Sequence, residues 1–316
     1  MKGRQEYSNQ ARCPGRRWLA GAGAVMYWLA CCCAAAPENA VRDVEEAAAG
    51  VFSRQPEWEV VFRGVELAEL EAEVPRRMRG AAVRIDGDAP GLEFVLTPSN
   101  GEREGETDGW KTSTFLKRMG CQVAINAAPF SPVHLSEDKP QEVVGLLVNR
   151  GTVVSAELRP ALALERDGRA RIVERPETAE GLWNAVSGFG IVLRAGELAG
   201  EEKPLHPRTA AGVSRDGMTV ILLVIDGRQP GHSEGASTRE VGAWLRALGA
   251  WDGLNLDGGG TTTLVIEDAK GGAQVVNRTI HGGRPGLERV SASHLGVRAQ
   301  RLPGAATDPE RERQGP

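Results

Sequence analysis

The sequence predicts an α+β fold in which successive hairpins build a mostly antiparallel or mixed sheet with few helices. Three observations support it. The chain has 316 residues with 40 glycines but only 5% aromatic residues, a composition typical of short strands joined by tight turns. Runs rich in valine and leucine alternate with turn-forming pairs. Only one long amphipathic helical pattern interrupts these runs, so we expect a single main domain.

Residues 1–36 have the layout of a signal peptide or an N-terminal anchor. Arg16 and Arg17 precede an apolar run over 18–36, and a basic segment followed by an apolar one organises such signals. The run is mostly alanine, glycine and cysteine, which makes it a weak permanent span. We expect export to the periplasm or the extracellular space, with a retained membrane anchor as the alternative.

Cysteine use fits removal of this segment. Four of the five cysteines lie in or beside it, and a lone remaining cysteine cannot form an internal disulfide. Cys31 lies where a lipoprotein signal would be cut, although Trp28 occupies the place of a small aliphatic residue, so a lipid anchor is a further alternative. Cys121 is expected to be an inert buried side chain.

The first part of the mature chain is predicted to be a linker over 37–57, followed by the main domain over 58–300. Strands are expected where valine, isoleucine and phenylalanine concentrate, and a short helix where apolar residues precede Gly120. These elements are strands at 58–65, 82–85, 92–96 and 123–125, and a helix at 110–119.

Hairpins dominate the middle of the domain, each marked by a turn whose residues tolerate positive φ. An amphipathic helix and three more strands follow, and the charged tail over 301–316 is predicted to be disordered. The turns are at 149–151, 167–168, 195–196 and 216–217, the helix is at 238–248, and the strands are at 254–256, 262–266 and 294–298.

The strongest chemical signal is the run NLDGGGTTT at 255–263. A buried strand delivers the Asp257 carboxylate to three glycines and then to three hydroxyls. Absent side chains let backbone N–H groups approach an anion, and threonine hydroxyls add donors. A plain hairpin turn is the simpler explanation of an Asp-Gly pair, but the long glycine run favours an anion site. It is no Walker loop, because the lysine and the following helix are missing.

An ordered set of motifs resembles the phosphodiester glycosidase family, over about 123–297. The set comprises Ile125-Asn126, Ser187-Gly188, HPRTAAG at 206–212, IDGR at 225–228, Glu240 in a helix and NLDGGGTT at 255–262. One member of that family removes N-acetylglucosamine from a phosphodiester on mannose. The resemblance therefore implies a hydrolase that cleaves the glycosidic bond of a sugar-1-phosphodiester, and the layout of residues 1–36 adds the expectation of export. The family usually has glycines after the first asparagine, whereas this chain has Ala127 and Ala128, which alters one pocket wall.

Chemistry and resemblance together predict the site. An oxocarbenium-like transition state is usually served by two carboxylates, and Asp257 and Glu240 are the predicted pair, with Asp226 as a second-rank candidate. Arg208 and Arg228 suit phosphate because a guanidinium offers paired N–H donors to two oxygens. The other predicted substrate- or phosphate-binding residues are Asn126, Thr209, Asn255, Gly258, Gly259, Gly260, Thr261 and Thr262.

Several of these residues also have a purely structural explanation. Ser237 and Glu240 fit a capping box, in which Glu240 bonds back to the start of its helix. Asp226 fits a turn residue that bonds its own backbone. Arg208 and Arg228, taken singly, fit surface arginines.

Two rival functions stay open. The sequence GHSEG at 231–235 matches a nucleophile elbow, with Asp257 and His281 following in the required order, which predicts a serine esterase using Ser233. An elbow serine, however, must lie directly on a strand-to-helix turn, and Gln229-Pro230 intervene here. The second rival is a non-catalytic carbohydrate or cell-wall binding module, suggested by the altered first motif.

Charge and histidine placement limit the partners. The net charge of -4, with mixed signs along the chain, gives no basic stripe for nucleic acid. The five histidines show no ligand spacing, so neither a metal site nor a cofactor is predicted. Backbone and aspartate oxygens could hold calcium, but nothing demands it. The expected partner is a sugar phosphate or a cell-envelope glycan.

Overall fold

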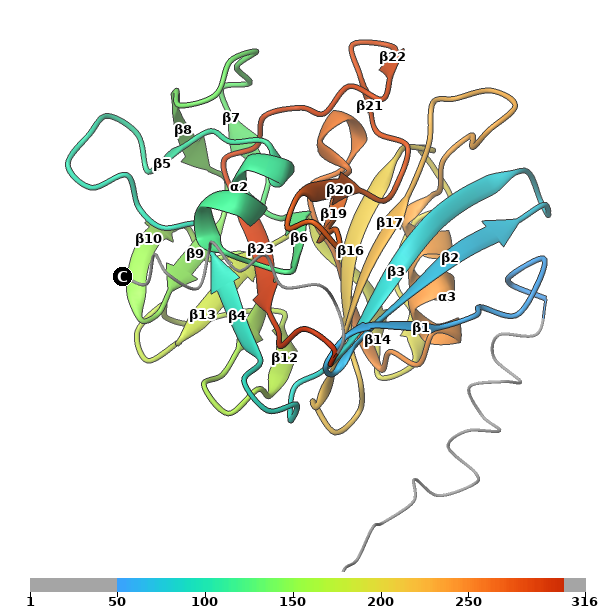
Figure 1. Ribbon diagram of the computed structural model, residues 1–316, viewed down its shortest axis with the longest axis horizontal. Helices are drawn as coiled ribbons and strands as arrows, with labels where there is room; N and C mark the ends of the chain where they lie inside the picture. Colours follow the sequence, from blue (N-terminus) through green and yellow to red (C-terminus); the bar gives the residue numbers. More distant parts are fainter. Residues whose placement is uncertain (1–49, 304–316) are drawn as a thin grey trace, which may run out of the picture. The chain divides into compact units, whose positions relative to one another are not determined.

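The computed structural model describes residues 50–303, which belong to one compact unit. It confirms the predicted fold class, because antiparallel sheets dominate this part of the chain (Figure 1). Its two α-helices are α2 (Thr112–Met119) and α3 (Thr238–Ala247). Neither is long and apolar enough to cross a membrane. The predicted signal peptide or anchor over 1–36 lies outside the described residues, as does most of the predicted tail.

The largest sheet has eight strands, and α3 covers one of its faces (Figure 1). Val241, Trp244 and Leu245 of α3 are buried against this face, as its amphipathic pattern predicts. In spatial order the strands are β1 (Glu59–Phe62), β2 (Val65–Ala72), β3 (Met78–Asp86), β17 (Thr219–Ile225), β16 (Arg208–Val213), β18 (Asp252–Asn255), β14 (Gly190–Arg194) and β15 (Glu197–Leu198).

Two five-stranded sheets share the main hydrophobic core with the opposite face of the large sheet. One consists of β10 (Thr152–Ala156), β9 (Leu146–Asn149), β13 (Asn184–Ser187), β11 (Ala161–Leu164) and β12 (Ala170–Val173). The other consists of β20 (Ala273–Val275), β19 (Leu264–Glu267), β6 (Val123–Asn126), β23 (His294–Arg298) and β4 (Glu93–Leu96). Helix α2 packs on the latter, where Phe115 and the buried Cys121 lie. Burial raises the pKa of the Cys121 thiol to about 12, which fits the inert side chain predicted.

Small sheets complete the fold. One contains β5 (Thr107–Asp108), β8 (Pro140–Val143) and β7 (Phe130–Ser131), and the other contains β21 (Ile280–His281) and β22 (Arg284–Pro285).

The predicted hairpins are confirmed as the pairs β9–β10, β11–β12, β14–β15 and β16–β17. Their turns adopt the positive φ that the sequence requires, with Arg150 at 50° and Ala195 at 49°. The predicted helix ending at Gly120 is also confirmed, because Gly120 is left-handed with φ 62°.

The N-terminal part of the domain differs from the prediction. The single strand expected at 58–65 is two strands, because a turn at Arg63-Gly64 separates β1 from β2. Strand β2 was not predicted, since its glutamates, alanines and leucines favour a helix. Pairing with β1 and β3 overrides that preference. Phe52, within the predicted linker, is buried and contacts Trp244 edge-on, with ring centroids 5.0 Å apart.

Three neighbouring strands of the large sheet place the predicted site residues together at one end of the strands. Strand β16 lies between β17 and β18, and its first residue, Arg208, is paired with Ile225 at the end of β17. Ala210 of β16 is paired with Asn255 at the end of β18. Asp226 and Asp257 therefore leave the sheet on either side of the start of β16.

Candidate active site

Two hydrogen bonds hold the backbone of Asp257 in place. Its N–H donates to the carbonyl of Ala127 over 2.8 Å, and its own carbonyl accepts from Nδ2 of Asn126 over 2.6 Å. The oxygen of that same amide accepts from the hydroxyl of Thr209 over 2.8 Å and from the N–H of Thr263 over 3.1 Å. Asn126 and Thr209 are fully buried. They position Asp257 and have no exposed surface for a ligand.

The Asp257 carboxylate lies among hydrogen-bond donors. Its Oδ2 accepts from Oγ1 of Thr261 over 2.6 Å and from Nη2 of Arg289 over 3.3 Å. Burial raises the pKa of Asp257, and the Thr261 hydrogen bond and the Arg289 charge oppose that rise. The side chain is 11% exposed, which leaves one edge of a nearly buried carboxylate open to a ligand.

The glycine loop, residues 258–260, needs its missing side chains because its backbone touches other groups. A Cβ on Gly258 would lie 2.7 Å from the carbonyl oxygen of Pro207, and one on Gly259 would lie 3.2 Å from Nη2 of Arg228. One on Gly260 would lie 3.0 Å from Nδ1 of His281. Gly259 also has a φ of 67°, which favours glycine. The loop therefore brings bare backbone against basic side chains.

Two arginines lie beside the loop with different surroundings. Arg228 is exposed and holds a positive φ of 58°. Its Nη2 is 3.1 Å from Nδ1 of His206. Since arginine only donates, this nitrogen of His206 must accept, so the ring is neutral. Burial and the Arg228 and Arg208 charges lower the pKa of His206, in agreement. Arg289 is largely buried between Asp257 and Phe130, with its guanidinium carbon 5.6 Å from that ring centroid.

The Arg208 guanidinium donates hydrogen bonds to two backbone carbonyls. Its Nε donates to Ala236 over 2.9 Å and its Nη2 to Pro204 over 2.6 Å. Burial lowers the pKa of Arg208, and the nearby Arg228 charge lowers it further. Arg208 thus joins the start of β16 to the loop before α3, and its positive charge lies near that of Arg228.

Asn255 and Thr262 are buried and incompletely bonded. Asn255 donates from Nδ2 to the carbonyl of Leu256 over 3.1 Å. Among residues 50–303, neither Oδ1 of Asn255 nor Oγ1 of Thr262 has a hydrogen-bond partner. Both atoms are buried, so neither presents a surface to a ligand.

Glu240 forms the capping box that its sequence pattern predicts. Its Oε2 accepts from the Ser237 N–H over 2.8 Å, and its own N–H donates to the Ser237 hydroxyl over 3.2 Å. The same Oε2 is ion-paired with Arg76. Burial opposes ionisation of Glu240, but Arg76 and the Ser237 N–H outweigh it and lower its pKa. Within the described chain no hydrogen bond or ion pair joins Glu240 to Asp257.

Asp226 is buried in a different set of contacts from Asp257. Its carboxylate bonds Nε2 of His232 over 2.8 Å, Nδ2 of Asn277 over 2.9 Å and the N–H of Arg278 over 3.1 Å. Burial raises the pKa of Asp226 despite these bonds. Over residues 50–303, no hydrogen bond or ion pair joins its side chain to Asp257, and its neighbours are a histidine, an amide and a backbone N–H.

Ser233 does not have the geometry of a nucleophile. It is fully buried, its hydroxyl donates to the carbonyl of Asp226 over 2.7 Å, and it accepts from the N–H of Arg79 over 3.1 Å. It lies in the loop between β17 and α3 and not on a strand-to-helix turn. The elbow required for the esterase alternative is therefore absent at this position.

The sequence missed Arg289, which is the cation in direct contact with Asp257. The segment before β23 that contains it has no recognisable motif, so only the fold places it there. His206 lies in the motif HPRTAAG, from which no role is predicted for it, and the sequence predicts a role for His281 only in the esterase alternative. Across the described chain, no group of three or more His, Cys, Asp or Glu is arranged to hold a metal.

The family model for phosphodiester glycosidases matches residues 119–298. Among solved structures, the catalytic domain of zebrafish N-acetylglucosamine-1-phosphodiester alpha-N-acetylglucosaminidase, described as auto-inhibited by its pro-peptide, has a TM-score of 0.59 at 16% identity. This similarity covers 84% of this chain and 95% of that one.

Two bacterial structures are also similar. A Burkholderia pseudomallei protein described as exported has a TM-score of 0.52 at 17% identity, covering 70% of this chain and 74% of its own. A Synechocystis protein has a TM-score of 0.53 at 15% identity, covering 75% of this chain but only 62% of its own length. These similarities show the fold. No curated protein matches. Because the family model covers more than half of the sequence, the chain belongs to the phosphodiester glycosidase family.

Proposed function

We propose that the chain is a hydrolase that cleaves the glycosidic bond of a sugar-1-phosphodiester. The observation that supports this most is the loop site, defined as Asp257, the glycine loop, Arg228 and Arg289. It combines a nearly buried carboxylate with two guanidinium groups and bare backbone. Family membership favours the same chemistry. The activity of the zebrafish relative is consistent with it.

The charges of the loop site suit a phosphate leaving group. When the bond between the anomeric carbon and the phosphate oxygen breaks, both bonding electrons stay with the phosphate. Arg228 and Arg289 would stabilise that negative charge. Phosphate leaves more readily than a sugar alcohol, so the reaction depends less on a general acid. Glu240, the other predicted carboxylate, is ion-paired with Arg76, and its lowered pKa disfavours it as a general acid.

Asp257 would act on the sugar side of the bond. Its carboxylate would stabilise the positive charge that develops at the anomeric carbon, either directly or by accepting the proton of an attacking water. Asn126 and Thr209 would serve as positioning residues, since they hold the backbone of Asp257. Glu240 would hold the start of α3 as its cap, and a direct catalytic part for it stays a prediction.

We also propose that the protein is exported. Residues 1–36 have the layout of a signal peptide, and the similar protein from Burkholderia pseudomallei is described as exported. Cell fractionation of the expressed chain, with and without residues 1–36, tests this. Accumulation of the intact chain in the cytoplasm would contradict it.

The test of function is sugar release by the purified chain from a panel of sugar-1-phosphodiesters and carboxylic esters. Release from a phosphodiester that is lost in Asp257→Asn supports the proposal and identifies the sugar. Ester cleavage without sugar release from any phosphodiester would contradict it. Saturable sugar binding without any turnover would instead favour the carbohydrate-binding module.

A further inference from the structure

A cavity of about 190 Å³ lies at the edge of the large sheet, outside the loop site. Strands β2 and β3 form one wall of it. Along their inner face, Val65 and Val83 pack in the main core. Further along the same face, at the two-residue spacing of a strand, Glu69, Glu71 and Arg79 line the cavity. The face thus changes from apolar to charged where the core ends.

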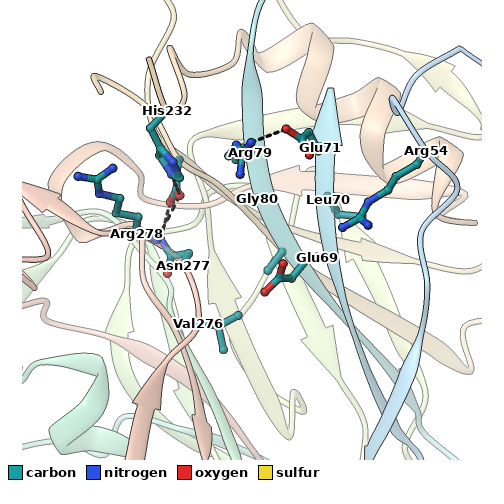
Figure 2. A pocket seen from close by; sticks show the side chains of 12 residues that line it. Arg54, Glu69, Leu70, Glu71, Arg79, Gly80, His232, Val276, Asn277 and Arg278 are labelled. Atoms are coloured by element: carbon teal, nitrogen blue, oxygen red, sulfur yellow. Dashed lines mark hydrogen bonds and ion pairs between the residues drawn. The ribbon is translucent and has the colours of Figure 1, made fainter. Parts of the chain in front are cut away.

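Asp226 and its partners form the facing wall. The Asp226 carboxylate is buried and bonded to His232 and Asn277, two of the side chains labelled in Figure 2. Nε2 of His232 makes that bond, and among the described residues its Nδ1 has no hydrogen-bond partner. If the proton is on Nε2, Nδ1 is left as an acceptor on a ring that lines the cavity and is partly exposed.

The lining of the cavity contains equal numbers of basic and acidic side chains. Three arginines and three carboxylates line it: Arg54, Arg79, Arg278, Glu69, Glu71 and Asp226. Arg79 is ion-paired with Glu71 over 2.6 Å, yet its Nε is buried and, within residues 50–303, without a partner. The Arg79 side chain is nevertheless 44% exposed, so its guanidinium can donate to a ligand acceptor in the cavity.

These features select one ligand chemistry. Equal numbers of both charges favour neither a polyanion nor a bare cation. A polyhydroxyl ligand uses both, because each hydroxyl donates one hydrogen bond and accepts others. The cavity is smaller than the ~300–1,000 Å³ pockets that hold drug-sized ligands, so it suits a single sugar ring.

We propose that this cavity, called the edge pocket, is a second binding site that takes one sugar residue of a neutral saccharide. The hydroxyls of that sugar residue bond to His232, Arg79 and the glutamates of β2. None of the lining residues belongs to the loop site, and the proposal does not depend on the function proposed for that site.

Histidine NMR separates the two sites in one spectrum. His232 lines the edge pocket, whereas His206 and His281 adjoin Arg228 and the glycine loop. The ring signals of the chain, assigned with single histidine substitutions, are followed at fixed pH. The probes are N-acetylglucosamine, glucose, mannose and inorganic phosphate, each up to about 50 mM, well above millimolar affinity. The expected result is a saturable shift of the His232 signal with at least one sugar.

Two variants and a control sharpen the test. Glu69→Trp fills the pocket from an exposed position, and Arg79→Met removes the guanidinium donors. Both should weaken the His232 response at least ~10-fold. Glu59→Trp makes the same change on β1 outside the pocket and should leave the response unchanged. An unmoved His232 signal with every sugar, a response to phosphate alone, or full sugar binding in Glu69→Trp would each overturn the proposal.

Discussion

The loop site and the edge pocket begin from the same local sequence and end with different chemistry. In each, a buried strand of the large sheet leads into an Asp-Gly pair, Asp226-Gly227 after β17 and Asp257-Gly258 after β18. Burial raises the pKa of both carboxylates. Around Asp257 the neighbours are Thr261 and a cationic guanidinium, whereas Asp226 is bonded by His232 and Asn277.

The two sites are neighbours, and Asn277 links them. Its Nδ2 donates both to Asp226 over 2.9 Å and to the carbonyl of Thr262 over 3.2 Å. The difference between them therefore comes from the segments that fold over each aspartate. Net positive charge gathers over the glycine loop, while the edge pocket balances its charges. This contrast predicts that cleavage of a phosphodiester depends on Asp257 and hardly on Asp226.

The largest expected effect distinguishes the two aspartates. Asp257→Asn should lower kcat for a sugar-1-phosphodiester by at least ~100-fold, because it removes the charge that stabilises the transition state. Asp226→Asn should cost less than ~10-fold, since its carboxylate is bonded within the edge pocket. Steady-state kinetics measures both, with circular dichroism to confirm the fold. Equal losses in the two variants would erase the distinction between the sites.

The arginines should follow the same division. Arg228→Ala should lower kcat/KM about 100-fold by removing a guanidinium from the departing phosphate. Arg278→Ala is the matched control, because Arg278 is also exposed but lines the edge pocket. It should leave kcat/KM within about twofold of the wild type. A loss in Arg278→Ala comparable to that in Arg228→Ala would contradict the placement of the phosphate in the loop site.

The pH dependence of kcat/KM should report Asp257. The reaction needs its ionised form, so activity falls as the pH drops through its pKa. Burial raises that pKa above the ordinary value of 3.8, which moves the acid limb upward. The positive charge of Arg289 lowers the pKa, so Arg289→Met should move the limb to still higher pH. Arg278→Met should not move it, and an unshifted limb in Arg289→Met would remove Asp257 as the titrating group.

The smallest effect concerns the glycine loop. Gly259→Ala should cost roughly 1–2 kcal/mol of unfolding free energy, because an alanine is strained at positive φ. Gly282→Ala should cost about the same, since Gly282 has a φ of 57° but open space around it. Only Gly259→Ala should also lower activity, because its methyl group would displace Arg228. Thermal unfolding and kinetics of the two variants check this, and matching activities would show that the contact with Arg228 is unimportant.

The sequence predicts much of this fold because turns are local. Positive-φ pairs such as Arg150-Gly151 set hairpins without help from distant residues, and the capping box at Ser237 likewise identified the start of α3. Strand β2 could not be predicted, since its residues favour a helix and only pairing with its neighbours makes it a strand.

The sites were harder to predict than the fold. Asp257 and its glycines stand in one run, so their association could be foreseen. Arg289 could not, because nothing in its own segment marks it. The sequence ranks Asp257 above Asp226 because three glycines and three threonines follow it, but the contacts of each carboxylate depend on the packing of 276–278 and 289. The capping pattern at Glu240 predicted its contacts with Ser237 but not its ion pair with Arg76.

The most direct test of the loop site is a crystal structure of Asp257→Asn with a sugar-1-phosphodiester bound. Slow turnover should keep the substrate intact. We expect the phosphate within hydrogen-bond distance of Arg228 or Arg289, and the anomeric carbon beside the side chain at position 257. A phosphodiester bound against Asp226 and His232, with the glycine loop empty, would contradict the account.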